Sequence, residues 1–497
     1  MTDVMPFVSS APQLHLSTDE MALVKKMLAR LDKKRGRNIE RQKYYDEHVG
    51  LVDLGISIPP QLKKINSVLG WPAKVVDVLA DRINFEKFVS PGDEEDPFGL
   101  NSIVEDNNFT ELFAQTNSSA LTHSCAFITI TQGDTSKGEP EILWLPKTAH
   151  WATGIWNKRT HTLKAGLSIT KADEDGVGGI TPREVALYLP DKTAIIKIRR
   201  DGQYEAEIIP NPTGRPLIVP VTVGADLRRP FGRARISRAV MSLTDSAIRT
   251  IVRSEISAEF YASPQRYMLG VDEETLSASK WSALISKMLT VSRDEDGELP
   301  QVGQFSQLSM QPHTEQLRQW AALLAAESQI PIDELGFPSE NPSSDSAIQS
   351  QRDPLRLGAN RVIRGYKASL RQLAIISVLL REGTSDVSSL EGLSKVSAWF
   401  APTFQTSDAA AADAVLKQVQ IMPWLAESPV ILEKLGYDAA AVERLIADKR
   451  RAEGAKILDA VLASRQAENP PAPQEGAPAP KEEPSDTTAQ APDNSKP

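Results

Sequence analysis

The sequence predicts an α+β fold in which long α-helices dominate and a β-rich portion lies between helical portions. Apolar residues from Ile236 to Ile251 recur every three or four residues, which is the spacing of one face of an α-helix. Between Ala126 and Val223, short runs of strand-forming residues alternate with turns rich in Gly, Pro, Asp and Asn. At 497 residues the chain exceeds one ordinary core, so two or more domains or one large mixed domain are expected.

Composition limits the class of protein. The chain is 41% hydrophobic and 24% charged, as globular proteins are, and its formal net charge of −9 argues against a general nucleic-acid coat while leaving room for a local basic face. The single cysteine, Cys125, allows neither an internal disulfide nor a multi-cysteine zinc cluster, which favours a reducing intracellular setting. We find no leader and no apolar run of membrane length, so a soluble protein without a membrane partner is expected.

The N-terminal part is predicted to be helical. Ser17–Glu20 has the composition of a helix start and precedes an amphipathic segment. Shorter helices are expected at Trp71–Ile83 and Leu100–Ser124. The first helix is expected to bury a face made of Met21, Val24, Met27, Leu28 and Leu31.

Six segments that follow are predicted as strands of an antiparallel portion. The alternation at Ala194–Ile198, followed by Asp201 and Gly202, predicts a hairpin. The six segments are Ala126–Ile130, Glu141–Leu145, Leu163–Thr170, Glu184–Leu189, Ala194–Arg199 and Leu217–Val223.

A long helix and a small module come next. The helix is predicted from about Arg235 to Ala262, roughly 40 Å at about 1.5 Å per residue. It ends at Ser263 because Pro264 disfavours helical geometry in the residue before it. Gln265–Ser309 is predicted to be a small α/β module, with a strand at 266–269, a helix around 279–288 and a strand at 289–292.

Two more helices follow the module. The second is predicted from about His313 to Ser328, with Leu317, Trp320, Leu323 and Leu324 as its apolar stripe. After a loop at Gly336–Ser344, the third is predicted to begin at a Ser344–Asp345 cap and to run to about Arg381, with a kink at Pro354.

The C-terminal part is predicted to contain one short strand and two helices. The strand is expected at Val396–Phe400, and the helices at about Ser407–Ile421 and Ala439–Ser464. From Ala467 to Pro497 almost no large apolar residue occurs, so this tail is expected to be disordered.

This order of parts resembles the portal proteins of tailed bacteriophages, in particular the siphophage portals of actinobacteria. The resemblance rests on Pro230–Ile236, which opens the first long helix, and on Asp245 within it. It also rests on Glu259–Tyr267, which closes that helix, and on Ile330–Gly336, which precedes the third helix. It covers most of residues 19–404.

The resemblance implies a portal-type division of the chain around long stem and tunnel helices. The wing would contain the N-terminal helices and the β-rich part, and the clip would be the small module. The implied parts are a wing at 1–229, a first stem helix at 230–264, a clip at 265–312, a second stem helix at 313–329, a tunnel-loop region at 330–345, a tunnel helix and return to the wing at 346–406, a helical crown at 407–466 and a disordered tail at 467–497.

The resemblance also implies a function. Portals are homo-oligomeric rings, typically of twelve subunits, at one capsid vertex, through which double-stranded DNA is packaged and ejected. The partners implied are the terminase large subunit, the head–tail connector or adaptor protein, and the major capsid and scaffolding proteins. The expected location is the virion, with host cytoplasm during assembly, and no cofactor is expected. Net acidity suits sliding of DNA, because strong phosphate contacts would have to break at every step.

Two sets of residues are candidates for the DNA channel. One side of the third helix is basic, and it is expected to meet either DNA phosphates or an acidic neighbouring subunit; a solvated or salt-bridged face is the alternative. The loop before this helix is expected to brush DNA, and a plain surface loop is the alternative. The helix residues are Arg352, Arg356, Arg364, Lys367 and Arg371, and the loop residues are Ser339, Glu340, Asn341, Ser343 and Ser344.

The hypothesis that the chain is an enzyme has weaker support. His123 and Cys125 would share a face if they lay on one strand, as a base and a nucleophile must, but core residues are the simpler interpretation. Asp333 and Glu334 form an adjacent carboxylate pair, for which a helix cap is favoured over a metal site. The chain contains no GxxxxGK[ST] loop, so it is not expected to hydrolyse ATP. A hydrolase or nucleic-acid-processing enzyme built on these four residues remains the alternative function.

Overall fold

The computed structural model contains two units, residues 1–404 and 405–497, and each is described by itself. Helices and small antiparallel sheets are both present, which confirms the predicted α+β class. The residues that the structure describes are 16–49, 67–91, 96–174, 179–199, 203–262, 266–269, 301–304, 309–338, 345–404, 408–437 and 439–468.

The N-terminal helices of the first unit follow the prediction, except that the segment predicted at Leu100–Ser124 is divided into two helices at Asn107 and Asn108, where Asn108 has φ 46°. Helix α1 begins in a capping box, in which Ser17 and Glu20 satisfy each other's backbone N–H groups. Val24, Met27 and Leu31 are buried on its predicted face. The helices are α1 (Thr18–Tyr45), α2 (Trp71–Ala80), α3 (Leu100–Asp106) and α4 (Phe109–His123).

The β-rich portion forms two antiparallel sheets. One has three strands in the order β3-β2-β9, and the other has five in the order β4-β5-β6-β7-β8, so each strand of the larger sheet pairs with its neighbour in sequence. The strands are β2 (Cys125–Gln132), β3 (Ile142–Thr148), β4 (Ala152–Asn157), β5 (Thr162–Glu174), β6 (Ile180–Tyr188), β7 (Lys192–Ile198), β8 (Tyr204–Pro210) and β9 (Ile218–Thr222). The predicted hairpin is confirmed as β7 and β8, whereas β4 and β8 themselves were not predicted.

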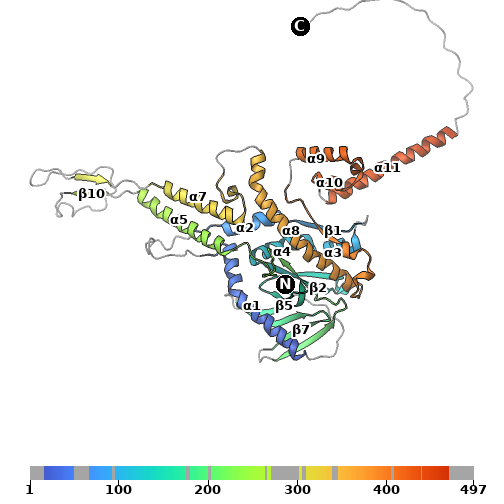
Figure 1. Ribbon diagram of the computed structural model, residues 1–497, viewed down its shortest axis with the longest axis horizontal. Helices are drawn as coiled ribbons and strands as arrows, with labels where there is room; N and C mark the ends of the chain where they lie inside the picture. The colour runs from blue at the N-terminus through green and yellow to red at the C-terminus, as the bar shows by residue number, and fades with distance from the viewer. Residues whose placement is uncertain are drawn as a thin grey trace, which may run out of the picture. The chain divides into compact units, whose positions relative to one another are not determined.

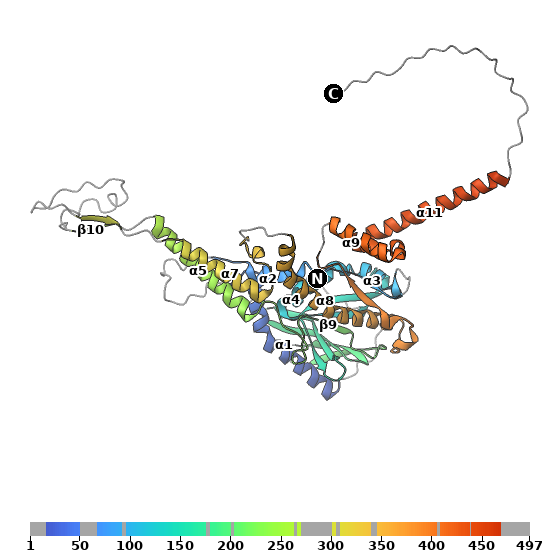
Figure 2. The same ribbon diagram turned by 45° about the horizontal axis from the view of Figure 1, so that its top comes forward.

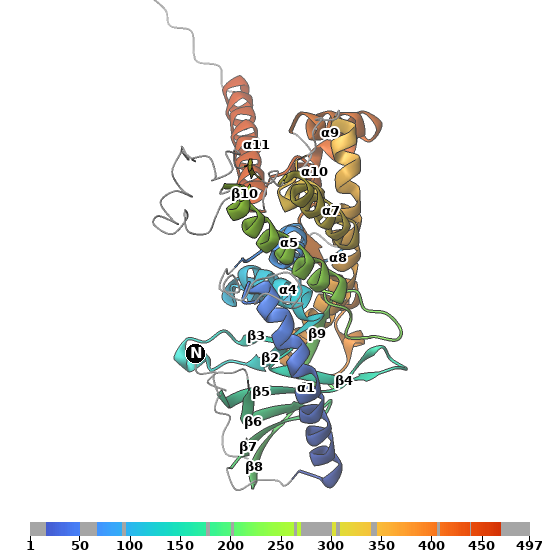
Figure 3. The same ribbon diagram turned by 90° about the vertical axis from the view of Figure 1, so that its left-hand side faces the viewer.

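Helix α1 packs on the larger sheet. Its buried residues join Leu167, Ile169 and Val185 of β5 and β6 in one apolar cluster. Figure 3 shows α1 running alongside β5 to β8. This cluster is separate from the main core, which lies around α8 and the three-stranded sheet.

The main core is organised by α8 (Asp345–Arg381), the third long helix. Every residue of its predicted apolar face is buried, namely Leu355, Ala359, Val362, Tyr366, Leu370 and Leu373. Two buried hydrogen bonds attach it to the rest of the unit. Tyr366 Oη donates to Asn117 Oδ1 on α4 at 3.0 Å, and Trp144 Nε1 on β3 donates to Ser377 Oγ at 2.8 Å. The helix continues through Pro354, and the kink there stays a prediction.

A two-stranded sheet joins distant parts of the chain beside this core. Strand β1 (Phe85–Val89) pairs with β12 (Ser397–Phe400), the strand predicted near Val396, whereas β1 was not predicted. Phe85 makes edge contacts with Phe88, Phe109 and Phe400, with ring centroids 5.2 to 5.8 Å apart. Edge-to-face packing of this kind adds to the stabilisation that burial provides.

The first and second long helices lie outside the sheets. They are α5 (Arg238–Ala262) and α7 (Gln311–Ser328), and between them β10 (Arg266–Leu269) pairs with β11 (Gln301–Gln304). Figures 1 and 2 both show α5 and α7 side by side. Helix α5 begins three residues later than predicted, because the Arg235 N–H donates to the carbonyl of Leu121 and Ser237 Oγ accepts the Val240 N–H as a cap.

The second unit is helical where it is described. It contains α9 (Asp408–Ile421), α10 (Val430–Lys434) and α11 (Ala439–Glu468), so both predicted helices are present. The predicted disordered tail falls almost entirely outside the described residues. Among the helices described in either unit, none combines the length and the apolar character needed to span a membrane.

Candidate functional site

Helices α5 and α7 form an antiparallel pair, which we call the stem pair. Small residues, Ala247 on α5 and Ala321 and Ala325 on α7, are buried in it together with Val252 and Leu324. Small side chains let two helix backbones approach closely. Leu323 was predicted in the apolar stripe of α7, but 46% of it is exposed, so the stripe turns toward Ala321 and Leu324 instead.

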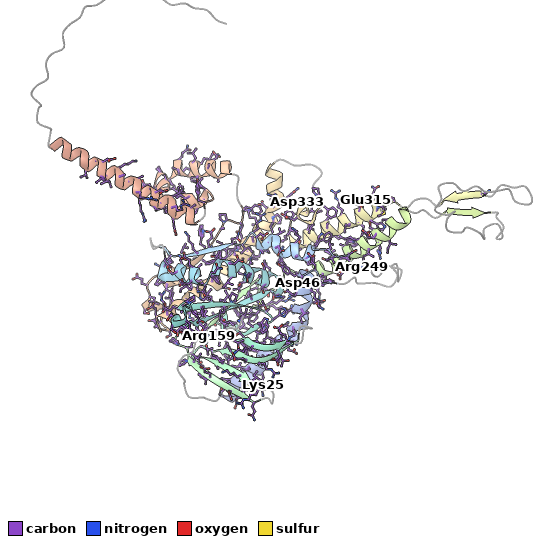
Figure 4. The ribbon with its side chains drawn as sticks, turned by 180° about the vertical axis from the view of Figure 1, so that it is seen from behind. Lys25, Asp46, Arg159, Arg249, Glu315 and Asp333 are labelled. Atoms are coloured by element: carbon purple, nitrogen blue, oxygen red, sulfur yellow. The ribbon has the colours of Figure 1, made fainter. Side chains whose placement is uncertain are left out.

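Polar contacts fix the register of the stem pair along its length. Trp320 Nε1 donates to Thr250 Oγ1 at 3.1 Å, and Ser257 Oγ lies 3.0 Å from His313 Nε2. Figure 4 labels Arg249 on α5 and Glu315 on α7, which mark the two members of the pair. Because the later of the two α5 residues, Ser257, meets the earlier of the two α7 residues, His313, the bonds set one antiparallel alignment.

Arg235 ties the base of the stem pair to the body of the unit. Its Nη2 donates to the Ser328 carbonyl at the end of α7 at 2.6 Å, and its Nε donates to the Val75 carbonyl of α2 at 3.4 Å. Burial lowers the pKa of the guanidinium to about 10, so it stays charged near neutrality. Arg233, the other arginine of the opening motif, pairs with Asp226 at 3.0 Å.

A second connection joins the stem pair to α1. Tyr44 Oη donates to Asp245 Oδ1 at 2.9 Å, so the aspartate of the resemblance motif holds two helices together. Burial raises the pKa of Asp245 above its usual value, although the Tyr44 hydrogen bond lowers it. The sequence placed Asp245 on the first stem helix but did not indicate its partner, which lies far away in the chain.

At the far end of the stem pair, β10 and β11 begin and end the small module. The register pairs Arg266 with Gln304 and Leu269 with Gln301, so the chain leaves and returns at adjacent positions. The predicted strand at 266–269 is confirmed. The predicted helix at 279–288 and strand at 289–292 lie outside the described residues.

The predicted basic side of α8 is at the surface. Four members, Arg352, Arg356, Arg364 and Arg371, are exposed, and Lys367 is half-buried. Arg356 pairs with Asp353 at 3.0 Å, and Arg371 donates to the Ser394 carbonyl, so these two have local partners. The loop candidates Ser339, Glu340, Asn341, Ser343 and Ser344 lie outside the described residues.

The pair His123 and Cys125 does not form a nucleophile and base. His123 ends α4 and Cys125 begins β2, with Ser124 between them at φ 88°, so the two do not share a strand face. Burial raises the pKa of the Cys125 thiol to about 11, and burial lowers the pKa of His123 to about 3. A protonated, buried thiol and a neutral imidazole are the states expected of cysteine and histidine in a protein core. His123 Nε2 lies 3.0 Å from Gln42 Oε1 on α1.

The carboxylates Asp333 and Glu334 are not assembled into a site. They lie in the first turn of the short 3-10 helix Ile332–Leu335, whose N-cap is Pro331, so the predicted side-chain cap is not made. Figure 4 labels Asp333. Within the part of the chain that the structure describes, no group of three or more His, Cys, Asp or Glu is placed to hold a metal ion.

Comparison of the sequence with known proteins shows what the chain is similar to. No family model matches the chain. Two curated proteins do: the portal protein of Mycobacterium phage L5 is 26% identical over 326 residues, and that of Mycobacterium phage D29 is 25% identical over 326 residues. The chain is similar in sequence to these two phage portal proteins. Each match covers 63% of this chain and 65% of the curated portal protein, slightly less than two thirds of that protein's length.

The fold also aligns with a solved structure. The chain aligns to one titled "Neck of native GTA particle computed with C12 symmetry" with a TM-score of 0.41 and 10% identity. The alignment covers 74% of this chain and 89% of the other.

Proposed function

We propose that this chain is the structural subunit of a phage portal, a ring at one capsid vertex through which double-stranded DNA is packaged and ejected. The observation that carries the proposal is the sequence similarity to two mycobacteriophage portal proteins. The order of the described elements supports it, because a long helix pair with a small module between its helices is followed by a long helix through the core.

The proposal assigns a role to each part. The stem pair forms a segment of the channel wall, and the module begun by β10 and ended by β11 is the clip on which the terminase large subunit and later the head–tail connector dock. The β-rich portion and α1 to α4 form the wing, and the second unit forms the crown. Assembly takes place in the host cytoplasm beside major capsid and scaffolding proteins, and the ring then remains in the virion.

A ring would also bury apolar side chains that a single copy leaves exposed. Leu323 on α7 and Leu357 on α8 are 46% and 56% exposed, each on a helix whose other face is buried within the same copy. Apolar side chains exposed in this way are expected to pack against a neighbouring copy in a closed ring.

The assembly itself is the first test. Purified full-length protein is expected to form closed rings, with twelve as the expected number of copies, as measured by mass photometry and counted by electron microscopy. A protein that stays monomeric across protein concentrations, salt concentrations and pH would refute the proposal.

The DNA-facing role of α8 is tested by its charge. Arg352→Gln with Arg364→Gln removes two exposed charges from the proposed bore. If both meet phosphates, the negative slope of log affinity against log salt concentration for a short duplex becomes shallower by about 2. The matched control, Lys25→Gln with Arg159→Gln, removes the same charge elsewhere and is expected to leave the slope unchanged. An unchanged slope in the α8 variant would place this side against a neighbouring subunit or solvent.

We propose no catalytic role. The alternative hydrolase or nuclease is not supported by the geometry, because Cys125 is a buried thiol and His123 is neutral. If hydrolytic activity of the purified protein were lost in Cys125→Ala or Glu334→Gln, this conclusion would be wrong.

A further inference from the structure

A pocket of about 830 Å³ lies between α1 and the segment that connects β9 to α5. Of the described residues that line it, eight are basic and one, Glu40, is acidic. We call it the basic pocket. This excess of +7 occurs in a chain whose formal net charge is −9, so the remaining residues together carry −16.

One wall of the basic pocket is a stripe along α1. The stripe consists of Arg30, Lys34, Arg37 and Arg41, spaced four, three and four residues apart, which places them on one side of the helix. Like charges at this spacing destabilise a helix unless an anion compensates them. Desolvation and then the neighbouring arginines, Arg37 first, lower the pKa of Lys34.

The opposite wall comes from the connecting segment. It contributes Arg228, Arg229 and Arg233, and Arg238 at the start of α5 adds a fourth arginine. Of these, Arg233 is paired with Asp226. Among the described residues, no hydrogen bond or ion pair joins the side chain of Arg228, Arg229 or Arg37 to a carboxylate.

The contacts that Arg30 and Arg41 make leave their charge uncompensated. Arg30 donates to the Gly154 carbonyl at 2.8 Å and stacks over the Phe231 ring at 4.6 Å. Arg41 donates to the His123 carbonyl at 3.2 Å, and its Nε is buried with no hydrogen-bond partner. Carbonyls and rings orient a guanidinium without neutralising it, so the basic pocket is a site prepared for an anion.

The connecting segment holds its arginines in place before any ligand arrives. Asp226 Oδ1 accepts the backbone N–H groups of Arg228 and Arg229 at 2.9 and 2.7 Å. Gly232 lies at φ +74°, and a Cβ there would stand 2.0 Å from the Val223 carbonyl oxygen, so this turn requires glycine. The segment is therefore a fixed turn, and binding would cost little ordering entropy.

The shape and apolar content of the site favour a protein ligand over nucleic acid. Leu227, beside the two arginines of the turn, is 93% exposed, and Phe231 lies in the wall of the pocket. An exposed leucine next to several guanidinium groups fits a protein surface that offers both carboxylates and apolar side chains. A DNA duplex presents phosphates on a broad surface, and it offers nothing apolar to Leu227 along its backbone.

We propose that the basic pocket binds an acidic segment of a second copy of this chain, with Leu227 packing beside it. The inference rests on the proposed assembly into rings, because the surplus acidity of the chain then supplies the ligand from the neighbouring copy. It adds to that proposal a named contact, carried by α1 and the turn at Asp226.

The test compares two charge reversals in the full-length protein. Arg37→Glu with Arg229→Glu alters both walls, and Lys25→Glu with Arg159→Glu makes the same change in charge at exposed sites outside the pocket, both labelled in Figure 4. The pocket variant is expected to reduce the fraction of protein in rings by about tenfold at fixed protein and salt concentration, because a like charge replaces a pairing one. The control variant is expected to assemble as wild type does.

A chemical readout identifies the partner directly. A carbodiimide couples an amine to a carboxylate in direct contact, so Lys34 is expected to become linked to an Asp or Glu of another copy. Rings reconstituted from isotopically light and heavy chains would show this link as a mixed-isotope peptide. Arg37→Gln with Arg229→Gln provides a milder change if the reversal fails to fold, and circular dichroism establishes folding for each variant.

The possible outcomes separate the two proposals. If wild type forms no rings, both fail. If wild type forms rings, the pocket variants assemble equally well and Lys34 forms no link between copies, the pocket inference alone is refuted. If the pocket variants assemble normally but lose affinity for a DNA duplex, the ligand is nucleic acid and the inference is also refuted.

Discussion

Tyr366→Phe tests how α8 is anchored, because it removes one oxygen atom from the centre of the core. The Tyr366 side chain is fully buried, and its Oη donates to Asn117 Oδ1, which is itself buried on α4. Burial raises the pKa of Tyr366, so the hydroxyl remains a donor at every ordinary pH. Phenylalanine retains the edge contact with the Phe113 ring, whose centroid lies 5.6 Å away. The change therefore isolates the hydrogen bond.

The expected cost follows from the group left behind. Asn117 keeps its bond from Nδ2 to the Ala80 carbonyl at 3.3 Å, but its oxygen loses its donor in a place without solvent. A buried acceptor without a partner costs about 1–3 kcal/mol. In a unit of this size such a loss lowers the melting temperature by only about 2 °C, because the entropy of unfolding grows with chain length.

Hydrogen exchange is the sharper assay, because it reports the opening of α4 and α8 separately from global unfolding. Tyr366→Phe is expected to speed exchange of amides in the middle of both helices by roughly tenfold or more, the equivalent of about 1.4 kcal/mol. Asn117→Leu in the same background is expected to recover part of the loss, because neither partner is then polar. Unchanged exchange in Tyr366→Phe would refute the reasoning that this bond holds α8 to α4.

Three further changes test other parts of the first unit. Burial raises the pKa of Asp245 above its ordinary 3.8, so its contribution to stability is complete below that value and is lost as pH rises through the raised pKa. Asp245→Asn still accepts the hydrogen bond from Tyr44, so the melting temperature of the variant minus that of wild type is expected to be larger at pH 7 than at pH 4. An equal difference at the two pH values would contradict this. Trp320→Phe removes the donor to Thr250 and is expected to cost about 1 kcal/mol, seen as faster exchange in α5 and α7 but not in β5. Cys125, with its pKa raised to about 11, is expected to react with a thiol-specific disulfide reagent only after denaturation, and rapid labelling of folded protein would show that it is accessible.

Sequence periodicity predicted the helices well and their ends less well. The buried face of α8 matches the predicted one, because six apolar residues at helical spacing leave one way to face a core. The start of α5 moved to Arg238 because a cap by Ser237 and a long-range bond to Leu121 decide where the helix begins. Of the two, only the cap has a local signal in the sequence.

The candidate site was predictable in order but not in its contacts. The sequence placed one long helix before the strand at 266–269 and another after it, as the structure does with α5, β10 and α7, yet Tyr44 and Asp245 meet across 201 positions of the chain. The stripe on α1 was visible as basic residues at spacings of four, three and four, but its significance depends on the arginines of a turn almost two hundred residues later. Nothing in the spacing of either segment predicts that they share a pocket.

The sequence by itself determined the α+β class and the order and type of the main elements, because helical and strand periodicity is a property of neighbouring residues, and its motifs carried the resemblance to portal proteins. Only the tertiary structure decided that β1 pairs with β12, and that His123 and Cys125 are buried without sharing a strand face. It also decided that Arg235 bonds to α2, α4 and α7. The physical reason is that burial and partner choice depend on which surfaces meet. Local pattern says which face is apolar, while desolvation and hydrogen bonding across the chain decide what that face meets.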